Sequence, residues 1–186
     1  MLAVSRPSAN VIEACDLLEH ERTFLSVSID ADRLPLERLT DKHRRLLSYW
    51  QSKRGRYDIP CRSDIDPCDI GPVLPNIMLW DILADGDYRC RLAGTEVCHH
   101  LIGKMQGVLL SDIPCPLLDE AQLEFNAARD RGLASLAERT LHWLGRPLVF
   151  YRHLLLPLVN DRGERHMLIG VITFHDIAEH ISGATH

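Results

Sequence analysis

The residues of this chain best suited to bind a metal are Cys98, His99 and His100, which are adjacent in the sequence. Thiolate and imidazole groups are the usual ligands of zinc. Neighbouring side chains on a helix point about 100° apart, however, so the three cannot all face one ion. No second pair of ligands three or four residues away completes a coordination shell. The segment therefore predicts ordinary helical residues and no metal site.

The acidic stretch between Ser63 and Asp69 offers carboxylate oxygens but not the spacing of a calcium loop. It lacks the glycine at the sixth position and the closing glutamate of an EF-hand loop. Asp66 directly before Pro67 is instead the pattern of a helix cap with proline at the first helical position. We expect a short helical turn here, and no calcium site.

Signatures of catalysis and of nucleotide binding are missing. Neither Cys90 nor Cys98 lies in a nucleophile motif, no G-x-S-x-G elbow occurs, and the carboxylates form no acid–base pair. The sequence also has no P-loop and no G-x-G-x-x-G. It therefore predicts no catalytic residue, indicates a protein that is not an enzyme, and leaves the identity of any cofactor unknown.

Composition and charge exclude several kinds of partner. The formal net charge of −5 gives no general attraction to nucleic acid or to an anionic membrane. The basic residues between 42 and 56 are typical of a solvated helix face, with a phosphorylated partner as the alternative. No apolar run approaches the roughly 20 residues of a membrane span, and the N-terminus lacks the pattern of a signal peptide. We expect a cytoplasmic protein with reduced cysteines.

The spacing of apolar residues predicts the elements that hold these side chains. Residues 148–177 contain two apolar runs around a polar turn, which is the pattern of a long β-hairpin. Further strands are expected at 77–83, 88–93 and 137–144, and helices at 39–55, 117–131 and within 8–22. Short links between paired strands favour an antiparallel sheet, so the predicted fold class is α+β.

Two strands, a helical crossover and three strands form an order that resembles a PAS domain. Pro157-Leu158, Asp161-x-Gly163 and the closing His175-Asp176-Ile177 resemble its last two strands. The segment Arg62-x-Asp64-Ile65-Asp66-Pro67-x-Asp69-Ile70 is similar to a family of stand-alone bacterial PAS-fold proteins. The resemblance implies a PAS-like five-stranded antiparallel sheet with a helical crossover at 39–177. An N-terminal helix and linker (1–38) would precede it, with one short strand as the alternative over residues 26–38, and a C-terminal tail (178–186) would follow. The resemblance also implies a sensory or regulatory role, without naming a ligand.

The concave side of such a sheet is where a small ligand would lie, in a mostly apolar cavity. The candidate residues for this pocket are Tyr88, Cys90, Leu92, Phe125 and Trp143. His142 and His153 on the neighbouring strands are candidates for polar contacts. The alternative is a filled core without a ligand, because protein interiors are normally close-packed.

The strand over residues 148–159 is apolar on both faces, whereas a sheet with one face in water alternates apolar and polar residues. Its second face therefore needs a cover, which could be a helix of the same chain or a second subunit. We expect a homodimer formed by this outer face and a helix within residues 8–54, with Val149, Tyr151 and Leu155 as interface candidates. The leading function is a ligand sensor; an adaptor that docks a signalling protein without a ligand is the alternative, and an enzyme is the least supported.

Overall fold

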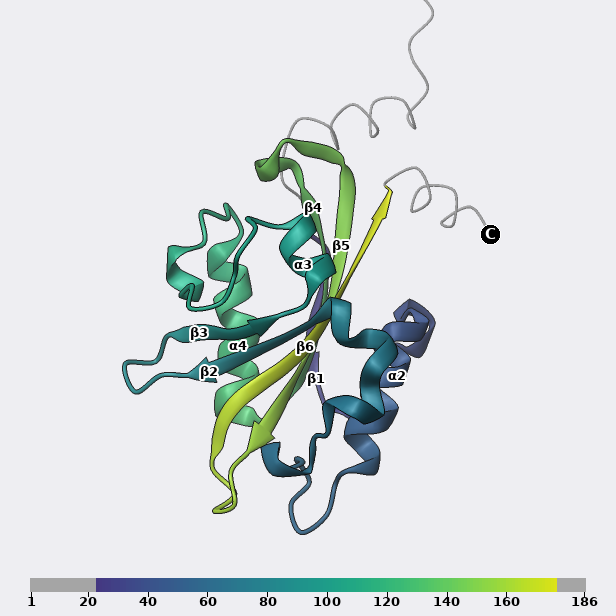
Figure 1. The fold of residues 1–186 in the computed structure, drawn as a ribbon, viewed down its shortest axis with the longest axis vertical. Helices are drawn as coiled ribbons and strands as arrows, with labels where there is room; N and C mark the ends of the chain where they lie inside the picture. The colour runs from purple at the N-terminus through teal and green to yellow at the C-terminus, as the bar shows by residue number, and fades with distance from the viewer. Residues whose placement is uncertain (1–22, 177–186) are drawn as a thin grey trace, which may run out of the picture.

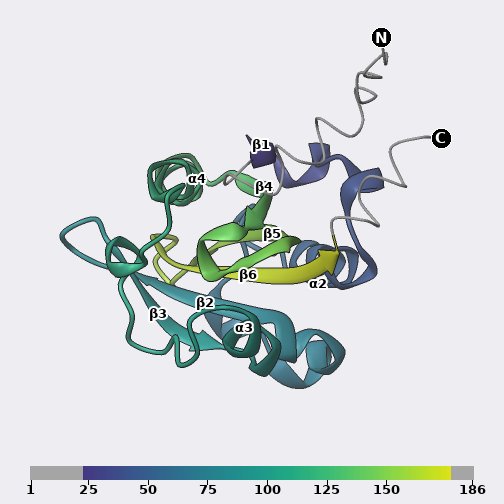
Figure 2. The same ribbon diagram turned by 90° about the horizontal axis from the view of Figure 1, so that it is seen from above.

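The computed structural model describes residues 23–176, which form a six-stranded antiparallel sheet with helices on both faces (Figures 1 and 2). The strands are β1 (Thr23–Ile29), β2 (Ile77–Ile82), β3 (Tyr88–Ala93), β4 (Ala134–Leu141), β5 (Arg146–Val159) and β6 (Arg165–Asp176). Their order across the sheet is β1-β4-β5-β6-β2-β3. The α+β class is confirmed, but the predicted count of five strands is one short. The additional strand β1 lies in the segment interpreted as an N-terminal helix and linker. The predicted helix within 8–22 and the tail at 178–186 lie outside the described residues.

Three α-helices occur among the described residues: α2 (Asp41–Ser52), α3 (Thr95–His100) and α4 (Leu118–Arg131). The short 3-10 segments are η1 (Ala31–Arg33), η2 (Leu36–Arg38), η3 (Arg62–Asp64), η4 (Pro67–Asn76), η5 (Leu110–Asp112) and η6 (His142–Leu144). The helices expected at 39–55 and 117–131 are confirmed as α2 and α4. The predicted cap is also present, since Asp66 Oδ1 accepts a hydrogen bond from the Cys68 amide at 2.8 Å.

The outer face of the sheet is covered by α2 of the same chain. His43, Leu46, Leu47 and Trp50 on this helix are buried, and the last three pack against Leu154, Leu156 and Leu158 of β5 in one apolar cluster. The Trp50 indole donates a hydrogen bond to the Pro157 carbonyl at 2.8 Å. The predicted cover is therefore an intramolecular one, and a second subunit is not needed for this part of the face.

The interface candidates on β5 lie elsewhere than expected. Because side chains alternate along a strand, the residues between the leucines under α2 face the opposite side of the sheet. Leu155 is 0% exposed in the core of the inner face, and Tyr151 packs against the same core. Val149 is half-buried opposite Asp176 of β6. Leu155 and Tyr151 are thus core residues of one subunit, and their assignment to a dimer interface is wrong.

The inner face of the sheet packs against α3, α4 and the segment that joins them (Figure 2). Its core contains Met78 and Trp80 of β2, Tyr88 and Cys90 of β3, and Phe125 of α4. The Trp80 and Tyr88 rings each meet Phe125 edge to face, with centroids 5.2 and 4.9 Å apart. This side of the molecule is therefore organised around the crossover helix, as the PAS-like order implies.

A β-bulge moves Leu92 away from the inner face. In the β2–β3 pair, Leu79 opposes Leu92 but Trp80 opposes Cys90, so Arg91 is an extra residue. One extra residue in a strand reverses the side to which all later side chains point. Leu92 is consequently 43% exposed, on the face opposite to Cys90. Its assignment to a pocket with Tyr88 and Cys90 is wrong.

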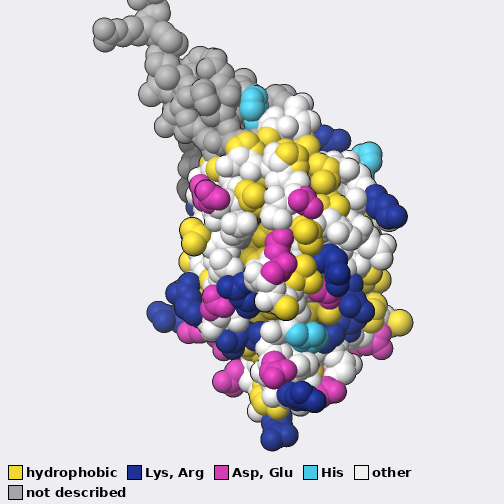
Figure 3. Space-filling view, turned by 90° about the vertical axis from the view of Figure 1, so that its left-hand side faces the viewer, with side chains coloured by type: hydrophobic (Ala, Val, Ile, Leu, Met, Phe, Trp, Pro, Cys, Tyr) yellow, Lys and Arg dark blue, Asp and Glu magenta, His cyan; other side chains and the backbone are white. Residues whose placement is uncertain are grey.

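Figure 3 shows basic and acidic side chains interspersed over the lower part of one face of the molecule. Between residues 23 and 176, no helix is long and apolar enough to cross a membrane.

Candidate functional site

A small cavity of about 80 Å³ lies between the inner face of the sheet and the helical crossover. Its walls come from β2, β4, β5, β6, α4 and the segment between α3 and α4. The lining residues are Met78, Trp80, Leu101, Met105, Leu110, Ile113, Cys115, Leu118, Ala121, Phe125, Arg139, Leu141, Trp143, Tyr151, His153 and Ile172. Most of these side chains are apolar, so the cavity has the general character expected of a small-molecule site.

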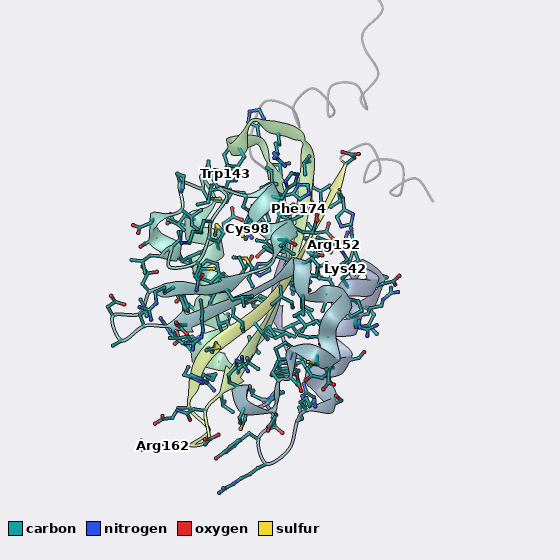
Figure 4. All side chains as sticks on the ribbon, viewed as in Figure 1. Lys42, Cys98, Trp143, Arg152, Arg162 and Phe174 are labelled. Atoms are coloured by element: carbon teal, nitrogen blue, oxygen red, sulfur yellow. The ribbon has the colours of Figure 1, made fainter. Side chains whose placement is uncertain are left out.

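Three of the six pocket candidates from the sequence line this cavity: Phe125, Trp143 and His153. Figure 4 places Trp143 at the same end of the molecule as α3. Tyr88 and Cys90 are buried in the core beside the cavity without lining it. Burial raises the pKa of both, to about 12, so both are neutral core groups at pH 7. His142, in η6, does not line the cavity.

A buried ion pair that the sequence did not reveal stands at the cavity wall. Arg139 of β4 is 1% exposed, and its Nη2 lies 2.5 Å from Glu124 Oε1 while its Nη1 lies 3.3 Å from Oε2. Glu124, on α4, is 2% exposed and also accepts a hydrogen bond from Ser26 Oγ of β1 at 2.6 Å. The pair therefore joins the crossover helix to two strands of the sheet.

The spacing on α4 carried a signal for this pair. Glu124 lies three residues after Ala121 and four before Ala128, so it falls on the same apolar stripe of the helix as these two alanines. A carboxylate on a buried stripe requires a partner of opposite charge. The sequence did not identify Arg139 as this partner. Because β4 is buried along its whole length, no alternation of buried and exposed positions marks Arg139 as a buried residue.

Two side chains of β5 complete the polar part of the wall. The Tyr151 hydroxyl interacts with the Arg139 guanidinium, and burial raises the pKa of Tyr151, so the phenol is neutral. Burial, together with the nearby charge of Arg139, lowers the pKa of His153 to about 3, so its imidazole is neutral at pH 7. The ring of His153 fits over Gly170, where a Cβ atom would lie only 2.7 Å from Nε2.

Three buried nitrogen atoms in the cavity wall have no hydrogen-bond partner: Trp80 Nε1, Arg139 Nε and His153 Nε2. Arg139 Nε lies 3.8 Å from Glu120 Oε2, beyond hydrogen-bond distance. Unsatisfied buried polar atoms are rare in folded proteins, and they commonly mark the place of a water or a ligand. Arg139 and His153 belong to the neighbouring strands β4 and β5, and Trp80 belongs to β2.

The cysteine and histidines of α3 lie outside the cavity. The Cys98 thiol donates to the Ala93 carbonyl at 3.8 Å, and the His100 ring stacks on Phe174 with centroids 4.2 Å apart (Figure 4). Arg146 Nη1 lies 3.0 Å from His100 Nδ1. Within residues 23–176, no group of three His, Cys, Asp or Glu side chains is arranged to hold a metal ion.

The comparisons with known proteins agree with this architecture. A family model described as "PAS domain" matches residues 39–173 of the 186. The comparisons with curated proteins and with solved structures returned no match. The matched range begins just before α2, which covers the outer face, and ends within β6, so it includes the cavity and its polar wall. The chain therefore belongs to the PAS domain family.

Proposed function

We propose that this protein is a cytoplasmic sensory or regulatory protein that binds a small molecule in the cavity of its inner face. The observation that carries this proposal is the presence of buried, unpartnered nitrogen atoms in a mostly apolar wall, above all Arg139 Nε and His153 Nε2 in its polar part. PAS domains typically have sensory roles rather than catalytic ones, which supports the same reading. No catalytic residue is proposed.

The crossover helix α4 is the element that would pass on occupancy of the cavity. Ala121 and Phe125 of this helix line the cavity, while Glu124 holds Arg139 and Ser26. A ligand transmits a signal only if it binds two conformations with different affinity. A molecule that pushes on Phe125 would shift the helix relative to β1 and β4, and this shift is the proposed change of state.

The experiment compares the natural chain with an Ala121→Leu variant in which a larger side chain fills the cavity. Native mass spectrometry of the purified natural chain should show a constant mass increment, and this increment should disappear in the variant. The exposed residue Leu123 on the same helix provides the control, because Leu123→Ala should retain the increment. An apo natural chain that also gains no mass from a metabolite extract would refute the proposal.

An adaptor without a ligand is the second candidate, and the size of the cavity favours it. About 80 Å³ is well below the roughly 300–1,000 Å³ of common small-molecule sites. In that case a signalling protein docks on the surface, and its affinity is the same for the natural chain and for Ala121→Leu. A loss of partner binding in this variant alone would favour the ligand-dependent form.

The homodimer remains a proposal without assigned interface residues. Because α2 covers the outer face of β5 within one chain, a second subunit would use another surface. Sedimentation velocity over a hundredfold range of concentration tests it: a monomer at every concentration contradicts the homodimer.

A further inference from the structure

The polar wall of the cavity restricts the charge of what can bind there. Arg139 is the only side chain of the lining that carries a charge at pH 7, and both of its Nη atoms face the carboxylate of Glu124. Glu124 also accepts a hydrogen bond from Ser26, so both of its carboxylate oxygens have partners. Glu120 Oε2 also lies 3.8 Å from Arg139 Nε, so an anionic ligand beside Arg139 would stand close to two carboxylates and would be repelled in a poorly hydrated interior.

A cationic ligand is disfavoured for the same reason. It would lie next to the Arg139 guanidinium, while the remaining wall offers aromatic and aliphatic groups, a thiol and a neutral imidazole. Burying a charge without a partner is strongly unfavourable. The wall as a whole therefore fits an uncharged molecule.

The unpartnered atoms indicate which polar group the molecule carries. Arg139 Nε–H is a donor only, so it requires an acceptor such as a carbonyl or hydroxyl oxygen. His153 Nε2 lacks a partner as well, and a neutral imidazole nitrogen can donate or accept. An oxygen atom of the ligand at this part of the wall would give these nitrogen atoms the partner that they lack.

The volume limits the apolar remainder of the molecule. The cavity of about 80 Å³ is roughly half the size of an engineered apolar cavity of about 150 Å³ that accepts benzene. Trp80, Phe125 and Ile172 close it on the apolar side. A chain of about five non-hydrogen atoms is therefore near the upper limit for this conformation.

We propose that the cavity binds a small uncharged molecule with a short aliphatic body and one hydrogen-bond-accepting oxygen, as in a short-chain ketone or alcohol. This inference rests on the proposed function and specifies its ligand class. It also predicts a weak intrinsic affinity, with a dissociation constant on the order of 1 mM, because so few atoms make contact.

Three probes of nearly equal size and different charge test the inference: 2-butanone, propionate and propylammonium. Each is titrated at pH 7 into the ¹⁵N-labelled chain, and amide shifts are followed by NMR. We expect 2-butanone to shift amides around the cavity, and to bind at least tenfold more tightly than either ion. Propionate or propylammonium binding as tightly as 2-butanone would overturn the ligand class and leave the proposed function intact.

A Glu124→Gln variant provides a second, independent readout. Removing the negative charge takes away the buried counter-ion of Arg139 and leaves only the more exposed Glu120 at 3.8 Å, so propionate should bind this variant at least tenfold more tightly than it binds the natural chain. Leu123→Gln on the exposed side of α4 is the matched control and should leave all three affinities unchanged. If Glu124→Gln does not fold, the comparison of the three probes on the natural chain decides alone.

The outcome for the ligand class is separable from that for the proposed function. If none of the three probes shifts amides at the cavity, the ligand class is wrong. A ligand detected by native mass spectrometry in the natural chain but not in Ala121→Leu would then still support a sensor. If both measurements are negative, the proposed function fails with the inference.

Discussion

The buried pair of Glu124 and Arg139 should contribute to stability in a strongly non-additive way. Replacing Glu124 by Leu leaves a guanidinium that is 1% exposed without its counter-ion, and takes the acceptor from Ser26 Oγ. Breaking one side of a buried ion pair costs about 3–5 kcal/mol, so we expect the free energy of unfolding to fall by about 4 kcal/mol. For a domain of this size, that is a large part of the total stability.

The double variant Glu124→Leu with Arg139→Met distinguishes a buried charge from a lost contact. Replacing both partners by apolar residues removes the unpaired charge, so the double variant should regain at least about 2 kcal/mol over Glu124→Leu alone. Urea unfolding followed by circular dichroism measures all three proteins, with Leu123→Ala as a surface control expected within about 0.5 kcal/mol of the natural chain. A loss below about 1 kcal/mol in Glu124→Leu, or additive effects in the double variant, would show that the pair is not buried as described.

Three further predictions follow from buried groups of the two cores. Burial lowers the pKa of His43 and of His153 to about 3, below the 6.5 of the unfolded chain, so the unfolded state binds more protons and stability falls as the pH drops below 6.5. Between pH 6.5 and 5 the two histidines together should lower the free energy of unfolding by about 3 kcal/mol, because each is already half protonated at pH 6.5 in the unfolded chain. Urea unfolding of His43→Gln at both pH values should show about half of this loss; an unchanged loss contradicts the assignment. Leu155→Asp should abolish the cooperative unfolding transition, since the Leu155 side chain is 0% exposed. If this variant folds and has an altered oligomeric state, Leu155 belongs to an interface after all. Gly170→Ala should lower the melting temperature, because the new Cβ would lie 2.7 Å from His153 Nε2. Gly55→Ala is the control and should not lower it, because the space around Gly55 is open. Equal melting temperatures of the two variants would contradict this packing.

The parts of the fold that could be predicted are those whose periodicity is local. The stripe of Leu118, Ala121, Phe125 and Ala128 predicts α4, and Gly132, with a φ of 69°, ends it as expected. The β5–β6 hairpin is equally local, since its turn closes on Gly163 with a hydrogen bond from its amide to the Asn160 carbonyl at 2.9 Å. These elements carry their own patterns of apolar spacing and turn residues.

The errors arose where tertiary pairing overrides local pattern. The segment β1 (TFLSVSI) alternates apolar and polar residues from Leu25 to Ile29, but its position at the edge of the sheet follows from its pairing with β4. The alternation of Tyr88, Cys90 and Leu92 is clean in the sequence, but an extra residue at Arg91 reverses its last member. Arg139 is inside because Glu124 from another element meets it. Each of these outcomes depends on a distant partner that no window of sequence contains.

The same distant contacts connect the cavity to the edge of the sheet. Tyr151 and Arg139 stand at the cavity, Arg139 binds Glu124, and Glu124 binds Ser26 of β1. A second contact of α4 with this strand, from Thr23 Oγ1 to Glu120 Oε2 at 2.6 Å, lies near its first residue. A ligand oxygen bound to Arg139 Nε would shift the guanidinium and disturb its bonds to Glu124. Because Glu124 lies on α4 and is also bonded to Ser26, the disturbance would reach β1. Edge strands have a single neighbour in the sheet and move at lower cost than central ones. This is the physical reason to expect that a response to a ligand in the cavity would be expressed at β1.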